Sequence, residues 1–215
     1  MNGRWPVTVT ARGPDGRTLL LRPLRRRDRR EWEALRDTNA AWLRPWEATA
    51  PEPGGLPLGH RALIRYYDRE ASAGRLEPFV IEVGGRLVGQ MHLFGISWGS
   101  MRSASAGYWV AESVAGQGIA PLALAAATDH AFGRLGLHRM EVNIRPENAS
   151  SLRVVEKLAF RDEGVRLRYL HIDGAWRDHR TFALTTEELA GQTLVARLHH
   201  AQHQPHERHT EQGPR

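Results

Sequence analysis

The chain has 215 residues, of which 41% are hydrophobic and none is cysteine, and it carries a formal net charge of +6. This length suits one domain with a full hydrophobic core, while the lack of cysteine excludes disulfides, thiolate metal sites and a cysteine nucleophile. No run approaches the 18 apolar residues of a membrane-spanning helix, and the N-terminus has no apolar signal-peptide core. We therefore expect a cytoplasmic protein with no membrane partner.

The first half of the chain predicts a strand, two helices and three antiparallel strands. Apolar periodicity and turn residues place these six elements at 18–22, 29–42, 60–73, 79–83, 87–96 and 105–111. Five arginines lie between positions 25 and 30, and we favour a solvated first helical turn over a nucleic-acid patch. Direct nucleic-acid binding is therefore not expected, although the basic surface would suit an anionic cofactor or partner.

The stretch from Gly107 to Ala131, GYWVAESVAGQGIAPLALAAATDHA, is the most informative part of the chain. It predicts a strand, a loop with Gly116 and Gly118, and a Leu- and Ala-rich helix to about 135 with Pro121 in its first turn. Unpaired N–H groups, the helix dipole and a glycine-lined approach together favour a phosphate group. An ATP-binding loop needs a Lys after the second glycine, and a dinucleotide loop needs a small residue where Pro121 stands. Two interpretations of this stretch remain: a site for another phosphate compound, or an ordinary strand–turn–helix without a ligand.

The rest of the chain predicts one strand parallel to its predecessor, a short helix and a final two-stranded hairpin. These elements cover 138–145, 149–158, 160–172 and 175–184. We expect a single domain over residues 1–190. The composition then changes to Gln, His, Arg and Pro, so residues 191–215 are predicted to be a disordered, His-rich tail. Its histidines lack a carboxylate or thiol partner, and no metal site is predicted.

Four separated segments carry a family resemblance: NAAWLRPW (39–46), GYWVAESVAGQGIAP (107–121), NIRPENASSLRVVEKLAF (143–160) and YLHIDGAWRDH (169–179). They resemble the GNAT N-acetyltransferases, and within them the ribosomal-protein-alanine N-acetyltransferases of the RimJ/RimL type. The resemblance spans 18–184 and implies an α/β (α+β) fold. In this GNAT fold about four helices flank a mixed, mostly antiparallel seven-stranded sheet whose fourth and fifth strands are parallel and splayed.

The resemblance also implies acetyl-CoA as the cofactor. In this family the pantetheine arm pairs with the fourth strand, and a main-chain N–H of that strand polarises the thioester carbonyl. The backbone that would pair is that of Trp109, Val110 and Ala111. The family's loop pattern Q/R-x-x-G-x-G/A puts the pyrophosphate on Gly116, Gln117, Gly118, Ile119 and Ala120. Ala115, in place of the usual Gln or Arg, is a further predicted coenzyme contact that lacks the family's side chain. Asn148 matches a coenzyme-contacting residue and would equally serve as an N-cap.

Ser151 matches the Ser that, in RimL-type enzymes, donates to the departing thiolate, so it is the predicted general acid and also a coenzyme contact. The Tyr that many GNAT enzymes use instead corresponds to Val155 here. The base is less defined, because two positions that hold glutamate in the family are Leu170 and Asn143. Glu141 shares a strand face with Asn143 and could act through a water, or it could simply pair with an arginine at the surface.

The acceptor groove is predicted near Trp46, Tyr108 and Tyr169, although these rings could instead fill the core. A weak base suits an α-amino group, because an amine with a pKa near 8 is about a tenth neutral at pH 7. We therefore expect direct acetyl transfer to the N-terminal α-amine of a protein, such as a ribosomal protein, by a monomer or homodimer. The alternatives are a small amine such as an antibiotic or polyamine, and a non-catalytic, ribosome-associated factor that binds CoA.

Overall fold

The structure is a computed structural model that describes residues 5–52 and 58–203. Its centre is an eight-stranded sheet with the order β1-β2-β3-β4-β5-β6-β8-β7. The strands are β1 Val9–Arg12, β2 Thr18–Pro23, β3 Leu76–Val83, β4 Arg86–Ser97, β5 Ser103–Val110, β6 Arg139–Ile144, β7 Arg161–Ile172 and β8 Ala175–Thr185. The helices are α1 Arg29–Thr38, α2 Ala40–Leu43, α3 His60–Ser72, α4 Ile119–Gly133, α5 Ala149–Lys157 and α6 Leu194–His203. None of these helices is long and apolar enough to span a membrane.

The predicted α/β architecture is confirmed, with three corrections to the element count: a strand at the sheet edge, a break in the first helix and a C-terminal helix. The prediction of seven strands was one short, because β1 pairs with β2 at the sheet edge, from Val9 opposite Leu21 to Arg12 opposite Thr18. The first helix was predicted to continue to 42, but it breaks at Asn39. The buried Asn39 side chain donates to Leu35 O at 2.8 Å and accepts from Glu112 N at 2.9 Å, which fixes the break against the loop after β5.

The prediction of a disordered tail over 191–215 was wrong for its first part. Residues 194–203 form α6, which packs against α4, with Leu194 and Leu198 fully buried. The two carboxylate oxygens of Asp129 accept from the backbone N–H groups of Leu194 and Val195 at 2.6 and 3.0 Å. Apolar contact and an N-terminal cap therefore hold this helix on the domain. Residues 204–215 lie outside the described residues.

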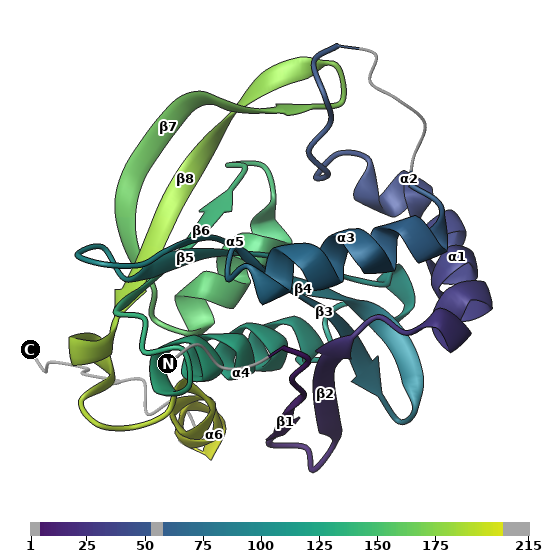
Figure 1. The fold of residues 1–215 in the computed structure, drawn as a ribbon. Helices are drawn as coiled ribbons and strands as arrows, with labels where there is room; N and C mark the ends of the chain where they lie inside the picture. The colour runs from purple at the N-terminus through teal and green to yellow at the C-terminus, as the bar shows by residue number, and fades with distance from the viewer. Residues whose placement is uncertain (1–4, 53–57, 204–215) are drawn as a thin grey trace, which may run out of the picture.

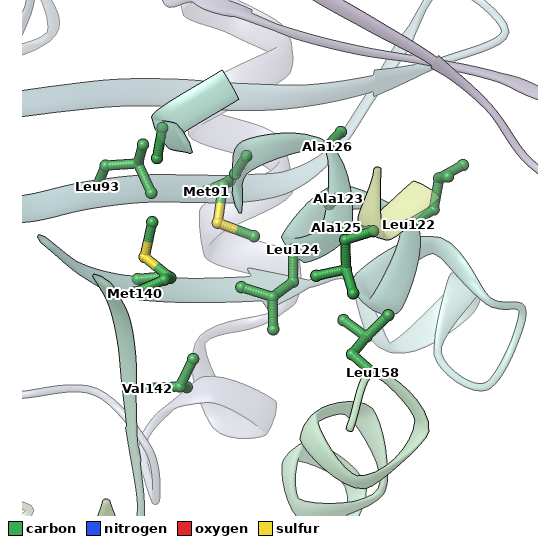
Figure 2. Close-up of a cluster of buried hydrophobic side chains, with 14 of the residues drawn as sticks. Met91, Leu93, Leu122, Ala123, Leu124, Ala125, Ala126, Met140, Val142 and Leu158 are labelled. Atoms are coloured by element: carbon green, nitrogen blue, oxygen red, sulfur yellow. The ribbon is translucent and has the colours of Figure 1, made fainter. Parts of the chain in front are cut away.

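Helix α4 occupies one face of the sheet and forms the centre of the main core. Eleven of its fifteen residues are buried, as expected of a helix that is apolar on all sides. Figure 2 shows Leu122 to Ala126 of α4 among Met91, Leu93 and Met140 of the sheet and Leu158, which directly follows α5. A smaller cluster on the opposite face joins Trp32 and Ile64, from α1 and α3, to Val80 and Leu87 of the sheet. The sheet thus lies between two helical layers, as Figure 1 shows.

The predicted parallel pair is confirmed as β5 and β6, and it separates early. The two strands pair only from Ser103 opposite Arg139 to Ser105 opposite Glu141. Beyond these three pairs β5 continues to Val110 and β6 to Ile144 without pairing to each other. The two strands therefore leave a gap in the middle of the sheet, with backbone groups of both strands facing it.

The β7–β8 hairpin extends beyond the rest of the sheet and arches toward the segment that follows α2 (Figure 1). Ala48 forms a bridge to Ile172, and Thr49 N donates to His171 O at 2.8 Å. These contacts connect the hairpin to the α2 side of the molecule. The result is a wall across one mouth of the gap between β5 and β6.

Candidate active site

The backbone of β5 presents alternate residues to the gap. Trp109 lies opposite Gln90, and Ala111 N donates to Val88 O at 2.8 Å, so these two residues direct their backbone groups toward β4. By the alternation of an antiparallel ladder, Tyr108 and Val110 direct theirs toward the gap. The Val110 carbonyl accepts from Trp42 Nε1 at 3.2 Å, which leaves the Val110 N–H to face the gap.

This alternation corrects the predicted set of backbone contacts. The prediction that Ala111 pairs with a ligand in the gap was wrong, because its N–H and its carbonyl are bonded to Val88 and Val114. Trp109 lines the cleft described next, and its ring packs against the Trp32 ring at 5.8 Å between centres. Among the three predicted residues, the alternation supports a backbone role for Val110 alone.

The glycine loop forms the predicted anion-binding turn at the start of α4. Gly116 and Gly118 have φ angles of +77° and +80°, a conformation that favours glycine. The first helical hydrogen bond runs from Leu122 N to Gly118 O at 3.3 Å, so the N–H groups of Ile119 and Ala120 have no partner inside the helix. With the helix dipole, these groups make a site for a phosphate.

Two of the six predicted loop residues use their N–H groups inside the loop. Ala115 N donates to Glu112 O at 3.1 Å, and Gln117 N donates to Val114 O at 3.4 Å. Neither N–H group is therefore free for a phosphate, and the predicted coenzyme contacts of Ala115 and Gln117 stay predictions. Gly116, Gly118, Ile119 and Ala120 remain as the donors of the loop.

Sequence reasoning missed Arg17, which holds this loop from the β1–β2 turn. Its guanidinium donates to Gln117 O at 2.5 Å and to Gln117 Oε1 at 3.1 Å, while Asp15 binds the same guanidinium. Gln117 Nε2 also donates to Ser113 O at 3.1 Å. Arg17 and Gln117 lie 100 positions apart, so no local pattern could reveal the contact.

A cleft of about 530 Å³ runs from this loop to the gap. Its floor is the end of β5 and the glycine loop, and its sides come from α2 and α5. Two cations of α5, Arg153 and Lys157, line it together with the N-terminal residues of that helix. A long ligand that carries phosphates at one end fits this combination of a cationic rim and free N–H groups.

A second cavity, of about 400 Å³, opens on the opposite face of the sheet, under the β7–β8 hairpin. The cleft and this second cavity share five lining residues, which are Trp46, Tyr108, Trp109, Asn148 and Ser151. All five surround the gap between β5 and β6. The two spaces therefore meet at the gap, and ligands that enter from opposite faces can meet there.

Ser151 and Tyr108 lie where the two spaces meet. Asn148 caps α5, its Oδ1 accepting from Ser151 N at 3.1 Å and from Ser150 Oγ at 2.8 Å. The N-cap role of Asn148 is thus confirmed, and it fixes the backbone of Ser151. Burial raises the pKa of Tyr108, while the nearby Ser151 side chain works against this rise. The Tyr108 hydroxyl is buried without a full hydrogen bond to any described residue, as expected of a group that awaits a ligand.

Glu141 and Asn143 of β6 were both predicted as candidates for catalysis, and the structure places only Asn143 at a cavity. Glu141 does not line either space, because its carboxylate pairs with Arg139 at 2.9 Å and Arg166 at 3.1 Å. The prediction that it acts at the reaction centre was wrong, and the surface ion pair is the correct alternative. Asn143 lines the second cavity, where its Oδ1 accepts from Thr181 Oγ1 at 2.8 Å.

The three predicted acceptor-site rings all line the second cavity. The guanidinium of Arg145 lies 5.5 Å from the ring centre of Trp46, and Arg145 Nη1 donates to Pro45 O at 2.7 Å. Tyr169 packs edge-on against His179 at 5.5 Å. These contacts place the rings at the cavity wall, and their role in binding an acceptor stays a prediction.

Two histidines in the second cavity were also missed from the sequence. His92 comes from β4, and burial lowers its pKa to about 3. His179 comes from β8, and burial, with help from the nearby Arg145, lowers its pKa as well. Both imidazoles are therefore neutral at pH 7. Strand alternation could have shown on which face of the sheet each histidine lies. It could not have shown that the two strands, distant in the sequence, line one cavity.

The fold and site define a class: enzymes that transfer a group from a phosphate-bearing carrier on one face of a split sheet to an acceptor on the other. The chain belongs to the GNAT acetyltransferases, since the family model described as "Acetyltransferase (GNAT) domain" matches residues 18–161. It is accordingly an N-acetyltransferase, and the predicted GNAT fold and enzyme class are confirmed.

Individual relatives agree with this family. The chain is 31% identical to the Bacillus subtilis protein named "Probable N-acetyltransferase YjcK", over 79% of this chain and 94% of that protein. It is 31% identical to the Escherichia coli [ribosomal protein uS5]-alanine N-acetyltransferase, over 70% of this chain and 78% of that protein. The solved structure of Mycobacterium smegmatis RimJ in complex with CoA-disulfide is 42% identical, covers 94% of this chain and 98% of that chain, and has a TM-score of 0.84. The predicted resemblance to the RimJ/RimL type is confirmed.

Proposed function

We propose that the protein transfers the acetyl group of acetyl-CoA to the N-terminal α-amine of a ribosomal protein. The observation that carries the proposal is the junction of the cleft and the second cavity at Ser151 and Tyr108, in the gap between β5 and β6. Relatives named as a ribosomal-protein-alanine acetyltransferase and as RimJ support the acceptor. A ribosomal acceptor would place the reaction in the cytoplasm.

The residues of the cleft fit acetyl-CoA. The free N–H groups of Gly118, Ile119 and Ala120 would hold the pyrophosphate, and Lys157 and Arg153 supply positive charge beside it. The gap leaves β5 unpaired where a pantetheine arm would lie. The buried Tyr108 hydroxyl lies near Ser151 there but makes no well-formed hydrogen bond to a described residue. When bound, acetyl-CoA supplies an acetyl group activated as a thioester.

The residues around the gap have distinct roles in the transfer. The N–H of Val110 faces the gap and would stabilise negative charge that develops on the carbonyl oxygen. Ser151, fixed by the Asn148 cap, would supply a proton to the departing sulfur. Trp46 and Tyr169 wall the second cavity through which the amine enters. With no cysteine in the chain, direct transfer in a ternary complex is expected.

The charge of the second cavity favours a protein N-terminus over a polyamine. Glu47 is its only acidic member among the described lining residues, and both of its carboxylate oxygens bind Arg36. A polyamine carries several positive charges and would require free carboxylates along its path. An α-amine has a pKa near 8 and a lysine side chain a pKa near 10.4, so a weaker base is enough to deprotonate the α-amine.

Thiol release from acetyl-CoA tests the proposal. Peptides that begin with Ala, Ser or Met are compared with a lysine peptide blocked at its N-terminus and with spermidine. Turnover confined to the free N-termini is expected, and turnover on spermidine alone would move the protein to the small-amine enzymes. A Ser151→Ala variant should bind acetyl-CoA normally and lose turnover. A wild-type protein that binds acetyl-CoA and acetylates nothing would favour a non-catalytic ribosome-associated factor.

A further inference from the structure

We propose that Nε2 of His179 accepts the proton that the acceptor amine gives up. This inference rests on the proposed function and supplies the base that the sequence did not define. His179 lies on β8, two residues before Thr181, which is opposite Asn143 of β6. Because alternate residues of a strand share a face, His179 and Thr181 face the same side of the sheet. His179 lines the second cavity together with Ser151 and Tyr108, although only 3% of its surface is exposed.

The hydrogen bonds of the ring decide which nitrogen can accept a proton. Nδ1 of His179 lies 3.1 Å from the carbonyl oxygen of Arg177. A carbonyl oxygen can only accept, so Nδ1 carries the hydrogen and Nε2 carries the lone pair. No hydrogen bond to Nε2 is present among the described residues. In this tautomer Nε2 can act as a base, and the hydrogen bond from Nδ1 to the strand backbone fixes the ring.

The surroundings keep His179 neutral at pH 7. Burial is the main cause of its lowered pKa, and the positive charge of Arg145 adds to it. The hydrogen bond to the Arg177 carbonyl, and to a smaller extent the charges of Glu147 and Asp178, raise the pKa without reversing the shift. The other charged or titratable neighbours are Arg177 on the same strand and, on β7, Arg166 and Tyr169. A neutral imidazole is the form that can take a proton.

The other candidates in the second cavity are less suited to this role. Glu47 is bound through both oxygens to Arg36. His92 Nδ1 lies 3.0 Å from the amide nitrogen of Gln90, which donates to it, so the hydrogen of His92 is on Nε2. Nε2 of His92 is thus a donor without a lone pair for a proton, whereas Nε2 of His179 has one.

The protons and electron pairs balance with His179 in this role. The bond that forms joins the amine nitrogen to the acetyl carbonyl carbon, and the carbon–sulfur bond breaks. The sulfur leaves with the electron pair of that bond and takes one proton. An acceptor that arrives as an ammonium ion loses two protons in all, so one ends on the thiol and the other leaves to solvent by way of His179.

The test compares wild-type protein with His179→Asn. The Asn amide can keep the donor to the Arg177 carbonyl but has no lone pair to replace Nε2. With an Ala-starting peptide at pH 7, we expect kcat/KM to fall about 100-fold or more. We expect the KM and the thermal shift for acetyl-CoA to stay unchanged. The matched control is His138→Gln, an exposed histidine paired with Glu187 away from both spaces, which should keep its full rate.

The pH profile separates a base from a structural residue. In wild-type protein kcat/KM should decrease as the pH is lowered past the pKa of His179, with the slope expected for the uptake of one proton. In His179→Asn this decrease at low pH should be absent. Instead, kcat/KM of the variant should increase as the pH approaches the pKa of the acceptor amine. The ratio of the wild-type to the variant kcat/KM should therefore fall about tenfold between pH 7 and pH 9. Free imidazole should restore part of the rate of His179→Ala.

Two results would overturn this role for His179. One is a His179→Asn variant within about threefold of the wild-type rate, and the other is a defect of constant size across the pH range. Both require a wild-type protein that acetylates peptides. A wild-type protein that acetylates none would instead contradict the proposed function itself, so the two failures can be told apart.

Discussion

Replacing Arg17 with alanine should weaken acetyl-CoA binding without slowing the chemistry. Arg17 does not line the cleft or the second cavity, and it acts through two hydrogen bonds to Gln117 in the middle of the glycine loop. Without them the loop has fewer constraints. The N–H groups of Gly118 and Ile119 would then have to be ordered at the moment of binding, which lowers affinity.

The size of this effect follows from the two contacts. A hydrogen bond from a charged donor contributes about 1.5–3 kcal/mol when shielded, and the partial exposure of Arg17 reduces this. We take about 1–2 kcal/mol for the pair. At about 1.4 kcal/mol per factor of ten, the KM for acetyl-CoA should rise about 5- to 30-fold. The value of kcat should stay within about twofold, since the gap is untouched.

Steady-state kinetics with varied acetyl-CoA and a saturating peptide measure both constants. Arg12→Ala removes the same charge from the same hairpin without a contact to Gln117, and it should leave KM unchanged. Arg17→Lys keeps the charge but not the two-pronged donor geometry, and it should behave like Arg17→Ala. An unchanged KM in Arg17→Ala would refute the reasoning. Full recovery in Arg17→Lys would show that charge, and not the fork to Gln117, is what matters.

Three further results are expected. Ser151→Ala should lower kcat at least tenfold and leave the thermal shift by acetyl-CoA intact, as measured by turnover and melting in parallel; loss of both would contradict a role as the acid. Leu124→Ala, at a fully buried position of α4, should lower the free energy of unfolding by about 2–5 kcal/mol in a urea titration. Asp129→Ala should cost about 0.5–2 kcal/mol and expose the N–H groups of Leu194 and Val195 to hydrogen exchange; unchanged protection there would contradict the cap.

Elements with strong local signals could be predicted from the sequence. The stretch from Tyr108 to Ala131 carries its own strand, glycine turn and apolar helix, and the structure has all three. Ser151 and Asn148, which the resemblance predicts as coenzyme contacts, both line the cleft. In these cases the residues that decide the structure are close together in the chain.

The features that were missed depend on distant partners. Strand β1 is short and is stabilised by pairing with β2. Helix α6 has polar residues over much of its second half, and its buried positions are Leu194 and Leu198. The spacing of these two leucines was a signal for a helix, but the polar composition around them concealed it. Glu141 and His179 could be assigned to strand faces, but only the assembled sheet showed that Glu141 meets two arginines and His179 meets the cavity.

The most direct test of the proposed function locates the acetyl group on the product. Purified ribosomal proteins with free N-termini are incubated with the enzyme and acetyl-CoA, and tandem mass spectrometry assigns each new acetyl group. We expect acetylation of α-amines at protein N-termini, and at least tenfold slower acetylation with a Ser151→Ala control. Acetyl groups on lysine side chains, or on no protein while the enzyme acetylates spermidine in a parallel incubation, would contradict this function.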